Sequence, residues 1–277
     1  MIFMEKFSVC IAVYKNDPPE FIRVAIDSVL IHQSVIPSEI VLVQDGPVPD
    51  EVSRLLIDYK NKYGDIFNLI KLSENKGLGN ALRLGVENAK YDIIARMDSD
   101  DISLPDRFRK QLELLESHPD VDLVGGQITE FIDTPDNIVA RRNVPLLHDD
   151  IIKYMRARCP FNHPTVMFRK KAVLDSGNYQ DWFWNEDYYL WIRMMEHGCV
   201  FANLPEVLVN MRSGEDQYSR RGGKRYFKSE KEIQNLMLHN GFISLPRYCF
   251  NVVARWGVQV AMPNWLRGFV FQKVFRK

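Results

Sequence analysis

The first hundred residues alternate between two hydrophobic periodicities, and this alternation constrains the fold more than any other feature. Continuous apolar runs rich in β-branched residues predict buried strands, and amphipathic segments between them predict helices. The predicted strands cover 7–13, 39–45, 67–72 and 92–98, and the predicted helices cover 18–33, 50–63 and 78–89. Strand–helix alternation with short links predicts an α/β fold with a parallel, Rossmann-like sheet, right-handed crossovers and helices on both faces.

The strict alternation ends after the fourth predicted strand. Ser103 is predicted to cap a helix that continues to residue 118, and the next strand is expected at 121–131. Residues 132–215 show a mixed pattern. Helices are expected near 149–157 and over 185–198, and a strand over 165–169, before the segment VFANLPEVLVNMR at 200–212. We therefore expect the parallel sheet to continue as a mixed one.

Composition and charge exclude several classes of protein. The 277 residues include 36 basic and 36 acidic ones, so the net charge gives no reason to expect a nucleic-acid partner. The four cysteines lie far apart, without the close pairs typical of a zinc site. Glu5 and Lys6 interrupt the N-terminal apolar run, and no stretch of about 18 uncharged apolar residues exists. We expect neither a signal peptide nor a membrane span.

Carboxylates follow two of the predicted strands at their carboxyl ends, where ligands bind in open parallel sheets. Asp45 follows the second strand in VQDGP, and Asp98, Asp100 and Asp101 follow the fourth in MDSDD. We expect Asp45, Asp98 and Asp100 to converge on one side of the sheet. Paired carboxylates attract a hard cation such as Mg²⁺ or Mn²⁺, which would offset their repulsion. The alternative, above all for Asp101, is capping of the next helix.

Five motifs in order resemble those of family 2 glycosyltransferases with the GT-A fold. They are FSVCIAVYKND, VLVQDGP, ENKGLGNALRLGV, IARMDSDDISLPDRFRKQ and WNEDYYLWIRM. The segment MRSGEDQYSRRGG further resembles bacterial enzymes that build O-antigen, capsule or exopolysaccharide. The resemblance implies a GT-A catalytic domain over 1–215, with a nucleotide-binding half at 1–101 and an acceptor half at 102–215. A basic lid and an amphipathic C-terminal extension would follow at 216–277.

The resemblance also implies a donor site with a metal ion. The residues implied to bind the nucleotide sugar are Tyr14, Asp45, Asn75, Lys76, Asp98, Ser99, His163 and Arg212. The residues implied to hold Mn²⁺ or Mg²⁺ are Asp100, Asp98 and His163. Asp45 would accept from the uracil imide, and the backbone N–H groups near Lys76 and Gly77 would favour a phosphate oxygen. Plain alternatives are a turn-forming Asp45, a loop tyrosine, a solvated lysine and a structural histidine.

Two acidic residues at a predicted helix start are the implied catalytic pair. By resemblance Asp187 is the general base that removes the acceptor hydroxyl proton, and Glu186 orients an acceptor or donor hydroxyl. Trp182, Trp184 and Trp191 lie close by in the sequence and suit the apolar faces of sugars. In-line attack assisted by one base would invert the anomeric centre. The alternative is an acidic pair that caps the helix.

The C-terminal quarter is basic and rich in aromatic residues. Arg212, Arg220 and Arg221 are expected to fold over a diphosphate as a lid, with a solvated basic loop as the alternative. From Arg247 onward the sequence mixes apolar and basic residues and contains no acidic residue. This pattern predicts an amphipathic segment on an anionic membrane surface, or a helix packed on the body of the protein.

These features lead to one expected function and two alternatives. We expect a metal-dependent, inverting transferase that moves a hexose or N-acetylhexosamine from a UDP-sugar to a saccharide acceptor carried by a polyprenyl-diphosphate lipid. It would act in bacterial surface polysaccharide assembly, peripherally on the cytoplasmic face of the inner membrane. One alternative is a sugar nucleotidyltransferase, although VYKNDPP lacks the glycine-rich signature of that class. The other is a non-catalytic, membrane-docked protein of the same fold.

Overall fold

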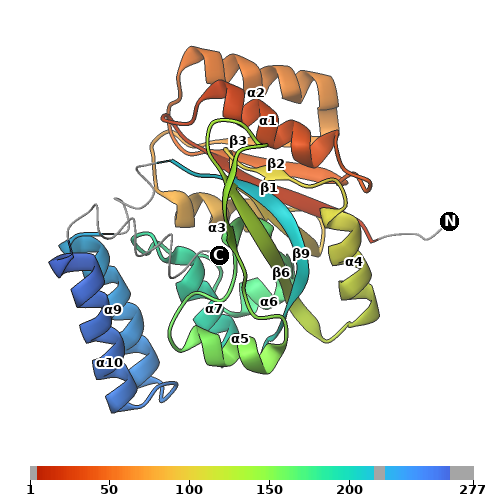
Figure 1. Ribbon diagram of the computed structural model, residues 1–277. Helices are drawn as coiled ribbons and strands as arrows, with labels where there is room; N and C mark the ends of the chain where they lie inside the picture. Colours follow the sequence, from red (N-terminus) through yellow and green to blue (C-terminus); the bar gives the residue numbers. More distant parts are fainter. Residues whose placement is uncertain (1–4, 215–221, 263–277) are drawn as a thin grey trace.

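The computed structural model describes residues 5–214 and 222–262. These residues form a nine-stranded sheet with helices on both faces (Figure 1). The strands are β1 (Phe7–Val13), β2 (Glu39–Gln44), β3 (Phe67–Lys71), β4 (Ile93–Met97), β5 (Ile102–Ser103), β6 (Val121–Phe131), β7 (Ile138–Arg142), β8 (Met167–Arg169) and β9 (Val200–Arg212). The α-helices are α1 (Pro19–Leu30), α2 (Asp50–Tyr63), α3 (Leu78–Asn88), α4 (Arg107–Ser117), α5 (His148–Met155), α6 (Lys170–Asp175), α7 (Glu186–Glu196), α9 (Lys224–His239) and α10 (Leu245–Trp256). Short 3₁₀ turns cover Gly64–Ile66 and His163–Thr165, and a π-helical turn covers Gly257–Ala261.

The N-terminal half of the sheet is parallel and has the predicted Rossmann-like arrangement. β1 lies between β2 and β4, and β3 lies beyond β2, all in the same direction. The register aligns Val13 with Gln44 and Ile11 with Met97, so these three strands end close together. The loops that follow them therefore leave from one edge of the sheet, where the candidate aspartates were expected.

The second half of the sheet is mixed, as expected. The strand order continues from β4 through β8, β6 and β9 to β5, and β7 pairs with β6. β8 runs antiparallel to both β4 and β6, whereas β9 runs parallel to β6. The long pairing of β6 with β9 brings the chain back to the edge at which the N-terminal strands end.

Ser103 does not cap a helix, so that prediction is wrong. It lies in β5 and pairs with Val209 of β9, while α4 begins only at Arg107 and has no side-chain cap. The pairing joins residues more than one hundred positions apart. A local sequence pattern carries no sign of such a partner, because serine before a helical segment fits either role.

The two faces of the sheet pack against different helices. The side chains of Val9 and Ile11 enter the core beneath α1, α2 and α4, whereas Cys10 enters the core beneath α3 and α7. Successive strand residues point to opposite faces, so a continuous apolar run is what a doubly covered strand requires. The second core reaches α5 and α9, so it connects the sheet to the C-terminal helices.

The pair of helices α9 and α10 lies beside α7 as a hairpin (Figure 1, blue). The polarity of α10 is reversed relative to an ordinary surface helix. Its one fully buried residue is Asn251, whereas Leu245, Phe250, Val253 and Trp256 are each at least half exposed. Across residues 5–214 and 222–262, no helix is long and apolar enough to cross a bilayer.

Helix α3 packs directly on β1 because residue 85 has no side chain. A Cβ atom at Gly85 would lie 2.2 Å from the Sγ atom of Cys10. This close packing draws the N-terminal end of α3, and the loop before it, toward the ends of the parallel strands.

We expect Gly85→Ala to lower the free energy of unfolding by ~1–3 kcal/mol, measured by denaturant titration, because overpacking outweighs the gain in helix propensity. Adding Cys10→Ala should restore most of the loss, because it removes the Sγ atom. The remaining neighbours of the new Cβ, the Val43 Cγ2 atom at 3.6 Å and the Cβ atom of residue 10 at 3.8 Å, lie at ordinary contact distances. Gly257→Ala, which meets open space, is the control and should cost nothing. Equal losses with and without Cys10→Ala would contradict this account.

Candidate active site

Asp45 follows β2 and holds the loop that precedes α3. One carboxylate oxygen accepts a hydrogen bond from the backbone N–H of Lys76 at 2.7 Å. The other accepts from the Asn75 side-chain amide at 2.9 Å and from the Gly77 N–H at 3.0 Å. A Cβ atom at Gly46 would lie 2.5 Å from the backbone nitrogen of Asn75, so only glycine allows this approach. Asp45, Asn75 and Lys76 are thus brought together as one anchored loop.

The anchoring changes the expectation for the backbone donors before α3. The N–H groups of Lys76 and Gly77 were expected to face a phosphate, yet both donate to Asp45. The Lys76 ammonium group lies 3.7 Å from the Glu74 carboxylate, and both side chains are mostly exposed. The direct contacts of Asp45 are with this loop rather than with Asp98 and Asp100, so the expected convergence of the three is not seen in hydrogen bonds.

A buried arginine faces the aspartates after β4. Arg96 is 2% exposed, lies within β4, and forms a bidentate ion pair with Asp98. The Arg96 carbonyl accepts a hydrogen bond from Arg107 at 2.6 Å, which ties the strand end to α4. Two N–H groups aligned with two carboxylate oxygens make a strong and directional pair. Asp98 is therefore oriented by a fixed cation.

Asp17, in the loop after β1, adds a carboxylate that the sequence analysis did not select. It accepts hydrogen bonds from the Ser99 hydroxyl at 2.8 Å and from the Tyr14 N–H at 3.0 Å. Burial, with a smaller contribution from Asp98, raises the pKa of Asp17 to about 6. Tyr14 is 37% exposed beside it. The carboxyl ends of β1 and β4 are thus joined through Asp17 and Ser99.

Asp100 and Asp101 meet the end of β9. The Asp101 carboxylate accepts from the backbone N–H of Arg212 at 2.8 Å, and the Asp100 carbonyl accepts from the Arg212 guanidinium at 3.2 Å. The guanidinium also lies over the rings of Phe21 and Phe131, at 3.8 and 4.7 Å from their centres. Asp101 does not cap α4, so the capping interpretation is wrong for this residue. Arg220 and Arg221 lie outside the described residues.

The carboxyl groups of Asp100 and Asp101 hold protons more tightly than exposed aspartates. Burial, followed by the charges of Asp98 and Asp17, raises the pKa of Asp100 to about 7. Burial, followed by the charge of Asp100, raises the pKa of Asp101 well above its usual range. One buried oxygen of Asp101 has no hydrogen-bond partner. Asp17, Asp98, Asp100 and Asp101 together form an acidic rim, and the positive charge near this rim does not balance its carboxylates.

The side chain of His163 is hydrogen-bonded to a tyrosine and not to these carboxylates. Its Nε2 atom lies 3.0 Å from the Tyr179 hydroxyl, and its ring packs against Trp191. Burial, and then the charge of Arg96, lowers the pKa of His163 well below its usual range, so the ring is neutral. Asp98, Asp100 and His163 do not form a ready ligand set. In the described parts of the chain, no three His, Cys, Asp or Glu side chains are arranged to hold a metal.

Glu186 and Asp187 begin α7, side by side. Burial, and then the charge of Asp187, raises the pKa of Glu186 to about 8. Burial also raises the pKa of Asp187, against the stabilising effects of the Tyr188 N–H and the Cys159 thiol. That thiol donates to the Asp187 carboxylate with a sulfur–oxygen distance of 3.4 Å. At neutral pH one member of this pair can carry a proton while the other accepts one.

A pocket of about 290 Å³ opens beside Asp187. Its other walls come from the end of β7, the segment after α5, the start of α7, and the C-terminal helices. The lining residues are Arg142, Ala157, Arg158, Cys159, Trp184, Asn185, Asp187, Tyr226, Glu230, Ala254, Arg255, Val258 and Gln259. The pocket therefore exists only because the α9–α10 hairpin is held against α5 and α7.

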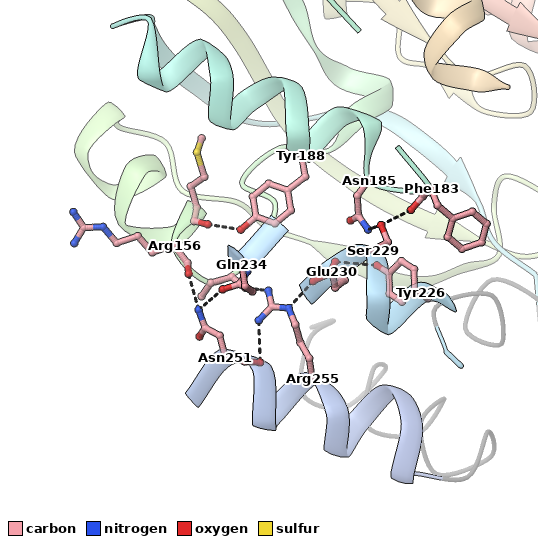
Figure 2. Close-up of polar contacts among 12 residues, drawn as sticks. Arg156, Phe183, Asn185, Tyr188, Tyr226, Ser229, Glu230, Gln234, Asn251 and Arg255 are labelled. Carbon is pink, nitrogen blue, oxygen red and sulfur yellow. Dashed lines mark hydrogen bonds and ion pairs between the residues drawn. The ribbon is translucent and has the colours of Figure 1, made fainter. Parts of the chain in front are cut away.

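Polar contacts fix that hairpin in place (Figure 2). The Ser229 hydroxyl of α9 donates to the Phe183 carbonyl at 2.6 Å and accepts from the Asn185 amide at 3.0 Å. Asn251 of α10 donates to the Arg156 carbonyl at 2.9 Å. Arg255 pairs with Glu230 at 2.5 Å and donates to the Ala157 carbonyl at 2.6 Å. The segment that carries Asp187 is thus braced from α9.

Comparison with known proteins agrees with this arrangement. The model of "Glycosyl transferase family 2" matches residues 8–177, and that of "Glycosyl transferase family group 2" matches residues 93–270. The chain belongs to glycosyltransferase family 2. It is 40% identical to the amylovoran biosynthesis glycosyltransferase AmsE of Erwinia amylovora, over 86% of this chain and 88% of that protein.

Other relatives extend over almost the whole chain. The UDP-Gal:alpha-D-GlcNAc-diphosphoundecaprenol beta-1,3-galactosyltransferase of Escherichia coli is 34% identical over 98% of this chain and 97% of that protein. The fold is similar to that of S. aureus TarS 1-349 in complex with UDP-GlcNAc, with a TM-score of 0.65, 16% identity and coverage of 97% and 76%. The mannosyltransferase PcManGT of Pyrobaculum calidifontis, in complex with GDP-Man and Mn²⁺, gives a TM-score of 0.65, 15% identity and coverage of 96% and 73%. These structures confirm the predicted GT-A fold.

Four residues of this candidate site were not selected from the sequence: Asp17, Arg96, Arg142 and Cys159. A signal existed for two of them. Asp17 follows a predicted strand just as Asp45 does, and an arginine inside the apolar strand IIARM needs a buried partner. Arg142 and Cys159 lie in segments with no chemical pattern, and only the folded chain brings them to Asp187.

The raised pKa of Glu186 predicts a pH-dependent stability. Between the usual pKa of glutamate and about 8, the folded protein keeps a proton that the unfolded chain releases, so stability falls as the pH rises through this range. Glu186→Gln should therefore raise the thermal unfolding midpoint at pH 8.5 by about 2–4 °C or more, and by less at pH 5. Circular dichroism would measure this, with the exposed Glu51→Gln as control. A variant that is less stable than wild type at pH 8.5 would contradict the assignment.

Proposed function

We propose that this chain is an inverting glycosyltransferase that moves a hexose or N-acetylhexosamine from a UDP-sugar to a lipid-linked saccharide during bacterial surface polysaccharide assembly. One observation carries the proposal. Asp187, one of the two buried acidic residues at the start of α7, borders a pocket, and both residues feel the positive charge of the same Arg96 that pairs with Asp98. The proposed proton acceptor and the acidic rim proposed to bind the nucleotide are thereby linked through one buried cation.

The named relatives support this choice of substrates. One acts in amylovoran biosynthesis, and another takes UDP-Gal and an acceptor linked to diphosphoundecaprenol. In our proposal, residues 1–101 bind the nucleotide and residues 102–215 bind the acceptor. Tyr14 and Asp45 would contact the base, with Asn75 and Lys76 near the ribose or phosphates. Ser99 would position Asp17 and Asp98 toward the donor.

The acidic rim fits a divalent cation by its chemistry. All its ligand atoms are carboxylate oxygens, which Mg²⁺ and Mn²⁺ prefer. The pKa of Asp100 is raised to about 7 by burial beside Asp98 and Asp17, and a nearby cation would relieve that repulsion. We propose Asp100 and Asp98 as the residues that hold the ion. When bound, the ion would stabilise the negative charge that develops on the departing diphosphate.

Side chains of the protein would accept the proton that the acceptor hydroxyl loses. Asp187 would accept the acceptor hydroxyl proton as that oxygen attacks the anomeric carbon, and the Cys159 thiol keeps its carboxylate oriented. Glu186, protonated at neutral pH, would donate a hydrogen bond to a sugar oxygen. A single base on the face opposite the leaving group gives inversion. Arg212 is anchored at the rim and would face the diphosphate.

We further propose that the enzyme works peripherally on the cytoplasmic face of the inner membrane. The apolar residues of α10 face outward, and the sequence beyond Trp256 adds basic residues without acidic ones. An anionic leaflet suits such a surface. Arg267, Lys273, Arg276 and Lys277, on which part of the expectation rests, lie outside the described residues.

The central experiment is a donor screen. The protein is incubated with Mn²⁺, a panel of UDP-, GDP- and dTDP-sugars and a saccharide-diphosphate lipid acceptor, and nucleotide release is monitored. We expect acceptor-dependent release of UDP from one UDP-sugar. Release of pyrophosphate would instead favour a nucleotidyltransferase.

Asp187→Asn should lower the rate of transfer by ~10²–10⁴-fold, because it removes general-base catalysis. Donor binding, measured by thermal shift with the UDP-sugar, should be unchanged. Asp58→Asn on exposed α2 is the control. Undiminished turnover by Asp187→Asn would refute the assignment of the base.

The membrane proposal is tested by point substitutions, because deleting α10 would also remove a pocket wall. Val253→Asp and Phe250→Asp, at exposed positions, should each reduce co-sedimentation with anionic vesicles several-fold while the protein stays folded. Ile57→Asp, at an exposed apolar position on α2, should bind as wild type. Equal vesicle binding by all four proteins would exclude α10 as the contact.

A further inference from the structure

The end of α5 is held by side chains from two other helices. A helix end leaves backbone carbonyl groups that no intrahelical N–H can reach, and these groups need donors from elsewhere. Three successive carbonyl groups find such donors, and the pairs are Met155 with Tyr188 of α7, Arg156 with Asn251 of α10, and Ala157 with Arg255 of α10. Figure 2 shows Asn251 and Arg255 on the inner side of α10. The turn that follows α5 is therefore fixed in part by α10.

Arg255 makes the charged one of these three contacts. Its side chain is only 13% exposed, and its Nε atom pairs with Glu230 of α9 at 2.5 Å. One terminal nitrogen donates to the Ala157 carbonyl at 2.6 Å, and the other donates to the Asn251 carbonyl at 3.3 Å. A guanidinium group is planar and rigid, so three acceptors fix its orientation. Arg255 therefore holds the carbonyl of residue 157 at a set position relative to α9 and α10.

Cys159 connects this turn to the proposed base. Its thiol donates to one carboxylate oxygen of Asp187 at 3.4 Å, and the backbone N–H of Tyr188 donates to the other oxygen at 2.7 Å. The carbonyl oxygen of Phe161 lies 3.6 Å from the same sulfur. A thiol has a single proton, so it bonds either to the carboxylate or to that carbonyl. A small displacement of residues 157–159 is then enough to change the acceptor.

We propose that Arg255 is a positioning residue for Asp187 and that it acts through residues 157–159. The inference rests on the proposed function, in which Asp187 is the base, and it adds a residue of the C-terminal hairpin to the catalytic arrangement. While Arg255 holds the Ala157 carbonyl, the thiol faces the carboxylate and both oxygens of the base have a donor. Without this contact the turn is free to shift, the thiol turns to Phe161, and the base loses one of its two donors.

The basicity of Asp187 depends on the same hydrogen bond. Burial raises the pKa of Asp187, and the bonds from the Tyr188 N–H and the Cys159 thiol oppose that rise. Loss of the thiol bond therefore raises the pKa further. The other charged or ionisable groups that act on this acidic pair include Glu186 of α7, Arg96 of β4 and Arg142 of β7. A substitution at residue 255 leaves these three groups in place, so a shift in the pKa of the base would report the thiol contact.

The first test measures transfer kinetics in Arg255→Gln, Cys159→Ala and the variant that carries both substitutions. Each single substitution should lower kcat by about tenfold, because a misplaced base slows the reaction, and should leave the KM for the UDP-sugar unchanged. The double variant should be no slower than the single ones, since both changes remove the same hydrogen bond. The acid limb of the kcat–pH profile should move to higher pH in all three. Arg247→Gln, an exposed arginine on the first turn of α10, is the matched control and should behave as wild type.

A second double variant separates positioning from folding. Arg255→Gln alone leaves the Glu230 carboxylate buried without its cation, which destabilises the fold. Combining it with Glu230→Gln removes that charge, so the unfolding midpoint should return toward the wild-type value while kcat stays reduced and the acid limb stays shifted. Recovery of kcat together with the midpoint would show that Arg255 serves stability alone and would overturn the proposal. A loss of about a hundredfold in Arg255→Gln with Cys159→Ala, the product of two independent effects, would also overturn it.

Infrared spectroscopy tests the contact without turnover, so it separates this inference from the proposed function. The S–H stretching bands of cysteines lie in a window free of other protein bands, and a hydrogen bond to a carboxylate moves such a band to lower wavenumber. The band that disappears in Cys159→Ala belongs to Cys159. It should move to higher wavenumber in Arg255→Gln and stay in place in Arg247→Gln, whether or not a UDP-sugar is used. An unmoved band in Arg255→Gln would refute the role of Arg255.

Discussion

The site depends on one buried cation. Arg96 lies in the middle of the sheet, where an unpaired charge would cost several kcal/mol, so it must be paired. Asp98 supplies the partner through two parallel hydrogen bonds. The same charge lowers the pKa values of Asp100, Glu186 and Asp187 against the effect of their burial. Groups that belong to separate motifs in the sequence therefore share one electrostatic centre.

The packing of α3 sets the distance between these groups. Gly85 lets the helix lie on β1, and Gly79 lets the segment before α7 approach, since a Cβ there would lie 2.7 Å from the Gln180 carbonyl oxygen and 3.3 Å from the Cβ of Glu186. The loop anchored by Asp45 begins the same helix. One helix thus positions the loop on the nucleotide side and the acidic pair on the acceptor side. Glycine at two positions is a requirement of close packing and not of turn formation.

Local pattern was sufficient for much of the fold. The bounds expected for α2 and β6 agree with those in the structure, since their periodicity and flanking residues are local properties. Ser103 was misassigned because its partner in β9 is remote in the sequence. The same reason limits the site. The aspartates were visible as residues that follow strands, but whether Asp45 would meet a ligand or its own loop depends on a chain conformation that no spacing encodes.

Other parts of the site are products of tertiary packing alone. Cys159 and Arg142 come next to Asp187 because α5, β7 and α7 meet there, and the hairpin closes the pocket over them. The attachment of that hairpin adds the polar contacts of Ser229, Asn251 and Arg255 to the apolar packing of α9 on the second core. Selection of these residues from the sequence would have required knowledge of the contact between distant helices.

The reversed polarity of α10 has an energetic consequence. Because folding leaves Leu245, Phe250, Val253 and Trp256 more than half exposed, a large part of the transfer free energy of these side chains, ~1.5–3 kcal/mol for each one fully buried, does not contribute to the native state. It remains available for contacts between this exposed apolar surface and another apolar surface. Substitutions on the exposed face of α10 can consequently change its affinity for apolar surfaces with little effect on the stability of the fold.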